Sequence, residues 1–191
     1  MRTTIIVAEL LVAVTTSSCG GRPSGGETAL PPVARGAYLV SFGGCNDCHS
    51  PKVFTPQGPV PDTTRLLSGY PADAKLPSVP ASALAPDKWG AVASNDLTAW
   101  AGPWGVSFAA NLTPDQTGLG AWREEDFIKT MRTGKHFGIG RPVLPPMPWY
   151  DVAALTDDDL KAVFAYLRSL KPIKNVVPGP LPPVGARLGR T

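Results

Sequence analysis

The sequence contains few charged residues and has no strong excess of either sign. Charged residues make up 17% of the 191 residues, and the net charge is only +3. Because hydrophobic residues reach 43%, we expect a globular chain rather than a disordered charged tail. A charge this small and scattered argues against a nucleic-acid partner, although a basic patch for an acidic protein partner stays open.

The sequence also lacks a hydrophobic run long enough to span a bilayer. A spanning helix needs about 20 apolar residues, whereas the segment from Thr3 to Val14 is shorter and is interrupted by Glu9. Its length suits the hydrophobic part of an export signal, and Arg2 supplies the positive charge that precedes it. Residues 1–18 are therefore predicted to be a signal peptide that directs the chain out of the cytoplasm.

Small residues and then Cys19 follow this segment, in an arrangement that resembles the bacterial lipobox. The resemblance implies that Cys19 is acylated and becomes the first residue of a lipoprotein anchored to the membrane. Thr16 stands where leucine is usual in that motif, and a soluble secreted form and an uncleaved anchor are the alternatives. Residues 19–32, rich in proline, glycine and serine, are predicted to form a flexible linker.

The other two cysteines lie in the motif Cys45-Asn46-Asp47-Cys48-His49. The pattern Cys-x-x-Cys-His is the attachment signature of c-type haem. Two thiols three positions apart on a short helical turn can each add to one haem vinyl group, and the adjoining histidine can bind the iron. The sequence thus predicts one covalent haem c on Cys45 and Cys48, with His49 as the proximal iron ligand. No cysteine is left for a structural disulfide.

Three other uses of a Cys-x-x-Cys pair fit the sequence less well. A zinc site needs four Cys or His ligands, and outside the motif only Cys19 and His136 are present. A thioredoxin-like redox motif lies near a βαβ pattern, whereas the helix-like residues 34–40 precede this motif and a proline-rich segment follows it. A simple extracytoplasmic disulfide is the third alternative.

A second axial ligand is expected on the other side of the iron, where low-spin cytochromes use methionine or histidine. Met147 is the favoured candidate, because Pro145, Pro146 and Pro148 hold the backbone around it extended and stiff. Two alternatives stay open, namely ligation by His136 and an iron with an open sixth site.

Hydrophobic periodicity predicts three helices, so the expected fold class is mainly α. The first covers residues 33–42, and the second covers residues 122–133 with Met131 packed in the core. The third is capped by Thr156 and ends at Lys171, which precedes a proline.

A long proline-rich insertion occupies residues 51–120. A loop of this length without structure is improbable inside a compact domain, so we expect a hairpin over residues 53–60 and a strand over residues 106–112. The insertion also contains three tryptophans, which are expected to cover the haem or to pack the insertion against it, with ordinary core packing as the alternative. They are Trp89, Trp100 and Trp104.

Three further segments carry a family resemblance. They read RGAYLV at residues 35–40, NLTPD at residues 111–115 and PMP at residues 146–148. With the haem motif, they resemble bacterial class I cytochromes c, and most nearly the cytochrome c domains of membrane-bound dehydrogenase cytochrome subunits. The resemblance implies a small helical domain around one haem over residues 33–171, followed by an extended tail over residues 172–191.

The resemblance also implies an electron carrier rather than an enzyme, located in the periplasm or cell envelope. Its expected redox partners are a dehydrogenase or quinol-oxidising complex on one side and a terminal oxidase or reductase on the other. Dehydrogenase cytochrome subunits usually repeat the haem domain, whereas this chain has one haem motif, which favours a single-haem shuttle or tethered domain. The alternatives are a permanent cytochrome subunit of a dehydrogenase complex and a haem enzyme or sensor with an open iron site.

Overall fold

The computed structural model describes residues 29–79, 84 and 87–183. The predicted signal peptide, Cys19, residues 20–28 of the predicted linker and residues 184–191 of the predicted tail lie outside these residues. In chain order, the helices and strands are α1 (Pro32–Phe42), α2 (Cys45–His49), β1 (Lys52–Thr55), β2 (Gly58–Pro61), β3 (Val92–Ala93), β4 (Ala99–Gly102), β5 (Gly105–Phe108), α3 (Glu124–Thr133), the 3-10 turn η2 (His136–Gly138), α4 (Trp149–Ala153) and α5 (Asp157–Ser169).

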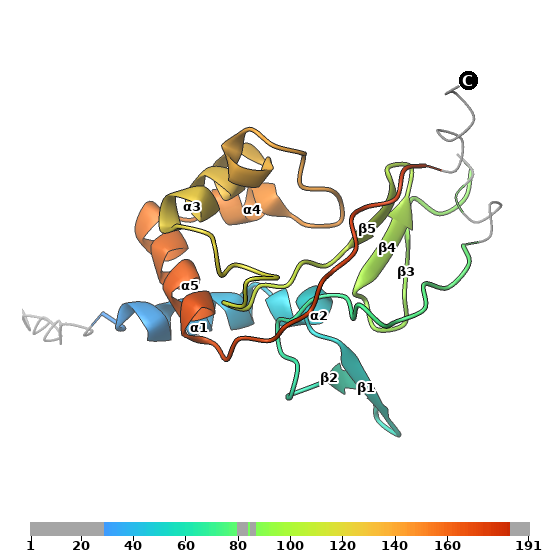
Figure 1. Cartoon of the computed structure of the whole chain (residues 1–191), viewed down its shortest axis with the longest axis horizontal. Coiled ribbons are helices and arrows are strands. Elements are labelled where there is room, and N and C mark those ends of the chain that lie inside the picture. The colour runs from blue at the N-terminus through green and yellow to red at the C-terminus, as the bar shows by residue number, and fades with distance from the viewer. Residues whose placement is uncertain (1–28, 80–83, 85–86, 184–191) are drawn as a thin grey trace, which may run out of the picture.

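Helices α1 and α5 pack directly against each other and carry much of the core (Figure 1). The approach is close because Gly36 of α1 has no side chain; a Cβ atom there would lie 1.9 Å from the carbonyl oxygen of Ala162 in α5. Arg35 strengthens the crossing by donating from Nε to the Asp159 carboxylate at 2.8 Å. The buried core consists of Val40, Leu67, Leu119, Phe127, Leu160, Val163, Phe164 and Leu167.

Helix α5 begins where its capping residue predicts. The Thr156 hydroxyl accepts a hydrogen bond from the backbone N–H of Asp159 at 3.1 Å, which satisfies one of the free donors of the first turn. Three acidic residues in that turn interact favourably with the positive end of the helix dipole and so stabilise the helix. Among the described residues, no helix has the length and hydrophobicity needed to cross a membrane.

Helix α3 is shorter than its predicted range of residues 122–133. It begins at Glu124, because the Asp126 carboxylate accepts the backbone N–H of Arg123 and so caps the helix there. Trp122 therefore lies in the segment before the helix, where its ring packs at a tilt against Phe137 with centroids 4.4 Å apart.

The insertion over residues 51–120 contains two small antiparallel sheets, so the chain combines helices with strands and is not simply mainly α. The predicted hairpin is confirmed, with Lys52 opposite Pro61 in the β1–β2 pair. Figure 1 shows this hairpin projecting from the body of the fold.

Strands β3, β4 and β5 form the second sheet, in that order. The strand expected over residues 106–112 is shorter, since β5 ends at Phe108. Trp100 and Trp104 are half-buried, and the Trp104 indole donates to the Ser107 hydroxyl at 3.2 Å. Trp89 is 72% exposed, so the alternative that it packs in the core is wrong.

Residues 172–183, which follow α5, contain no helix and are bound to the rest of the fold by hydrogen bonds. The Asn111 side chain donates to the Ile173 carbonyl at 2.8 Å. The Asn175 side chain donates to two loop carbonyls at 2.7 and 2.9 Å. Further along, Leu181 and Val106 exchange two backbone hydrogen bonds of 2.9 Å each. The segment therefore ties α5 to the insertion.

The close crossing of α1 and α5 predicts that Gly36→Ala destabilises the protein by about 2 kcal/mol, because the added methyl group overpacks the contact. Urea-induced unfolding followed by circular dichroism measures the loss. The matched control is Gly90→Ala, since a Cβ atom at Gly90 meets nothing within 4 Å. Equal unfolding midpoints for the two variants would show that the crossing tolerates a larger residue.

Candidate functional site

The five residues of the haem motif form the short helix α2. It begins after Gly44, whose φ of +63° is a left-handed conformation that favours glycine. Cys45 and Cys48 are both free thiols and are half-buried. Burial raises the pKa of each thiol, and the positive charge of Lys52 partly opposes this rise at Cys48. Two unoxidised thiols at this spacing are what thioether formation with a haem requires.

The His49 imidazole is held by a hydrogen bond to a residue outside its own helix. Its side chain is buried, and its Nδ1 atom lies 2.8 Å from the carbonyl oxygen of Ala110. Because that nitrogen donates, Nε2 keeps the lone pair that a metal ligand needs. Burial lowers the pKa of His49, which favours the neutral imidazole.

A second segment supports the C-terminal end of α2. The backbone N–H of Gly69 donates to the His49 carbonyl at 2.7 Å. Ser50 is fully buried, and its hydroxyl donates to the Asn46 side chain at 2.7 Å while accepting from the Leu67 N–H at 2.8 Å. The haem motif is thus braced by residues that lie about twenty positions further along the chain.

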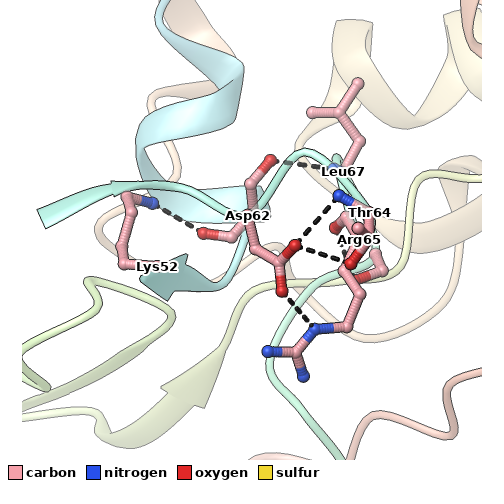
Figure 2. A network of polar contacts seen from close by, with 7 residues as sticks. Lys52, Asp62, Thr64, Arg65 and Leu67 are labelled. Carbon is pink, nitrogen blue, oxygen red and sulfur yellow. Dashed lines mark hydrogen bonds and ion pairs between the residues drawn. The ribbon is translucent and has the colours of Figure 1, made fainter. Parts of the chain in front are cut away.

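Asp62 builds the turn that leads into this supporting segment (Figure 2). Its carboxylate accepts from the backbone N–H of Thr64 at 2.9 Å and from the Thr64 hydroxyl at 2.6 Å. Arg65 donates to the other carboxylate oxygen at 2.8 Å. These hydrogen bonds, that of the Thr64 hydroxyl above all, lower the pKa of Asp62 to about 2.

The segment that carries Met147 is anchored on its N-terminal side. The Pro145 carbonyl accepts a hydrogen bond of 2.5 Å from the Ser107 hydroxyl. The backbone of Met147 donates to Leu144 at 3.3 Å and accepts from Trp149 at 2.9 Å, so the residue sits in a tight turn at the start of α4. Its side chain is half-buried.

One short segment therefore contacts both stretches that carry the predicted axial ligands. Ser107 holds the carbonyl two residues before Met147, and Ala110 holds the His49 imidazole. Figure 1 shows β5 beside the loop that leads into α4. Neither contact could be predicted from the sequence, because one serine hydroxyl and one backbone carbonyl leave no pattern. The nearest signal is the family motif over residues 111–115.

The other candidate ligand residues have partners of their own. His136 is half-buried in η2, where its ring meets the edge of Trp122 with centroids 6.0 Å apart. Burial lowers the pKa of His136, and the charge of Arg141 lowers it further. Met131 packs against the core, as predicted. Across the part of the chain that is described, no three His, Cys, Asp or Glu side chains converge, so the zinc alternative has no ligand set there.

A c-type haem fits the donor set of this site. The residues supply two free thiols for covalent attachment and a buried imidazole with Nε2 available for iron. They also include a half-buried thioether on an anchored segment. A neutral imidazole and a soft thioether are ligands of the kind that haem iron takes in electron-transfer proteins.

Comparison with known proteins gives the same class. No protein-family model matches the chain. It is 30% identical over 135 residues to the gluconate 2-dehydrogenase cytochrome c subunit of Pantoea cypripedii, which is 70% of this chain and 22% of that protein. It is 38% identical over 73 residues to the cytochrome c subunit of alcohol dehydrogenase (quinone) from Gluconobacter oxydans, which is 37% of this chain and 15% of that protein.

A third relative is the fructose dehydrogenase cytochrome subunit of Gluconobacter japonicus, 26% identical over 140 residues, which is 71% of this chain and 21% of that protein. The chain thus spans less than a quarter of the length of each of these three relatives. Its homologues are cytochrome c subunits of dehydrogenases, which supports a c-type cytochrome.

The Asp62 turn predicts a pH-dependent contribution to stability. Because the pKa of Asp62 falls from 3.8 to about 2 on folding, its ionised form stabilises the fold above pH 4, and this contribution is lost as the pH falls towards 2. We expect Asp62→Asn to cost about 1 kcal/mol at pH 6 and much less at pH 2.5. Urea midpoints of both proteins at the two pH values measure this, with Asp73→Asn as an exposed control. An unchanged cost at pH 2.5 would contradict the assignment.

Proposed function

We propose that this chain is a c-type cytochrome that transfers one electron at a time through a haem attached to Cys45 and Cys48. The observation that carries the proposal is the His49 imidazole, which is buried and donates from Nδ1 to Ala110. This arrangement leaves Nε2 as the proximal iron ligand. The bound haem supplies an iron that gains and loses a single electron, and the protein fixes its ligands and shields it from water.

Met147 is the proposed distal ligand. The hydrogen bond from Ser107 to Pro145 fixes the backbone before Met147, so the thioether loses little conformational freedom when it binds iron. The same segment fixes His49 through Ala110, so the two ligands share one support. When both ligands are held in the same place before and after electron transfer, the reorganisation energy of the transfer stays small.

The names of the relatives favour a second form of this function. All three are cytochrome subunits of dehydrogenases, which supports the proposal that this chain corresponds to one haem unit of such a complex. We propose a dehydrogenase as electron donor, either as a permanent complex or as a transient partner, and a quinol-oxidising complex or terminal oxidase or reductase as the other partner. Transient redox encounters are small and are guided by charge.

The proposed location is the periplasmic side of the cell envelope. The export signal over residues 1–18 and the lipobox-like Cys19 support a lipid anchor, with residues 19–32 as a linker and residues 33–171 as the haem domain. A membrane anchor would keep the haem domain near a membrane-bound donor and so raise the local concentration of the pair.

Optical spectra of the protein expressed with haem-maturation machinery test the function. We expect covalent haem, a low-spin spectrum with a weak near-infrared methionine–iron band, and no reaction of the reduced protein with carbon monoxide. Replacing both Cys45 and Cys48 by alanine should abolish covalent haem. Met147→Ala should remove the near-infrared band, whereas Met131→Leu, in the core, should keep it. A high-spin spectrum that responds to carbon monoxide would indicate an enzyme or sensor instead.

The Ser107 hydroxyl predicts a measurable effect on the distal ligand. Ser107→Ala removes the hydrogen bond to Pro145, and a bond of this kind contributes about 1 kcal/mol. Added imidazole, which competes with Met147 for the iron, should therefore bind about fivefold more tightly in the variant. Ser169→Ala is the matched control, because that hydroxyl also donates to a backbone carbonyl but at the end of α5. Equal imidazole affinities in the two variants would show that Ser107 does not restrain Met147.

A further inference from the structure

Lys52 is a charged residue whose side chain binds the backbone of the haem motif. It opens strand β1, three positions after His49, and its ammonium group folds back onto α2. Its Nζ atom donates to the carbonyl of Asn46 at 3.1 Å, to that of Asp47 at 2.8 Å and to that of Ser50 at 2.6 Å. One ammonium thus binds three carbonyls of the motif and the residue after it.

These contacts use the full donor capacity of the side chain, because a lysine ammonium has three N–H groups. The last carbonyls of a helix have no partner within the helix and form its negative end. A helix of only five residues has little stability of its own, so a cation bound to the carbonyls at its C-terminal end contributes much of what stabilises it. Lys52 is therefore held in one position.

The positive charge of Lys52 is not cancelled by a direct ion pair. None of the ion pairs found within residues 29–79, 84 and 87–183 includes it. Two carboxylates act on it from further away, those of Asp47 and Asp96. Asp96 accepts hydrogen bonds from the Ser94 and Thr98 hydroxyls at 2.6 and 2.8 Å, so its carboxylate is committed to its own loop.

We propose that Lys52 is a positioning residue for the haem site, which fixes the C-terminal turn of α2 and favours the reduced iron through its positive charge. This inference rests on the proposed function. The carbonyls that it binds belong to the residue before Cys48 and the residue after His49, so the charge is held beside a thioether and the proximal ligand. When one electron enters the iron, the iron loses one unit of positive charge, and repulsion by a nearby fixed cation decreases.

The test uses the haem-loaded full chain and three substitutions at one position. Lys52→Met removes the charge and the donors, Lys52→Gln removes the charge but keeps an amide donor, and Lys52→Arg keeps both. We expect the ratio of reduced to oxidised haem at a fixed applied potential to fall about fivefold in the Met and Gln variants. The Arg variant should stay within about twofold of the parent. The control is Lys161→Met, which removes an exposed lysine of α5 and should also stay within about twofold.

Haem content, measured as the pyridine haemochrome, separates the two proposals. A parent protein without covalent haem would overturn the proposed function. Normal haem content, with the same reduced-to-oxidised ratio in Lys52→Gln as in Lys161→Met, would overturn only the role of Lys52. If Lys52→Met does not accumulate as a folded protein, the Gln and Arg variants still decide the matter. A fall in the Gln variant that Arg restores supports the proposal, because a purely structural role would not follow the charge.

Discussion

The hydrogen bond from the His49 imidazole to the Ala110 carbonyl joins two segments that lie 61 residues apart in the chain. The five residues of α2 cannot orient the histidine alone, because a helix this short has little stability of its own. The orientation of the imidazole therefore depends on how the chain between these segments folds. The insertion that follows the haem motif is therefore part of the candidate site, because it supplies the carbonyl that orients His49.

The remaining support of α2 comes from both sides. Helix α1 leads directly into it and is itself fixed against α5 at Gly36, where backbone and backbone nearly touch. On the other side, Ser50 and the Gly69 N–H hold the end of the helix. Buried polar groups here are satisfied by the protein itself, since no buried side-chain nitrogen or oxygen in the described part of the chain lacks a partner.

Local signals were enough to predict helices α1, α3 and α5 and to single out the Cys-x-x-Cys-His motif as the candidate site, whereas the short helix α4 was not predicted. A cap at Thr156, a stripe of apolar residues on α5 and a five-residue motif each act over one or two turns of chain. The contacts of Ser107 and Ala110 act through space between residues far apart in sequence, and a single serine or a backbone carbonyl has no pattern to recognise. The extent of α3 was missed for a local reason, because an aspartate three residues into the helix moved its start.

The bound segment after α5 has a consequence for the order of folding. The Asn175 contacts close loops of 107 and 105 residues. The chain loses conformational entropy when such loops close, and the stabilisation by the contacts comes only afterwards. Residue 175 also leaves the ribosome after every segment that it touches. A chain interrupted before Ile173 would leave buried Asn111 and Thr113 without partners from the segment, and it would stay open to proteases. The contacts of the segment after α5 therefore form only in a chain that has been synthesised past this segment.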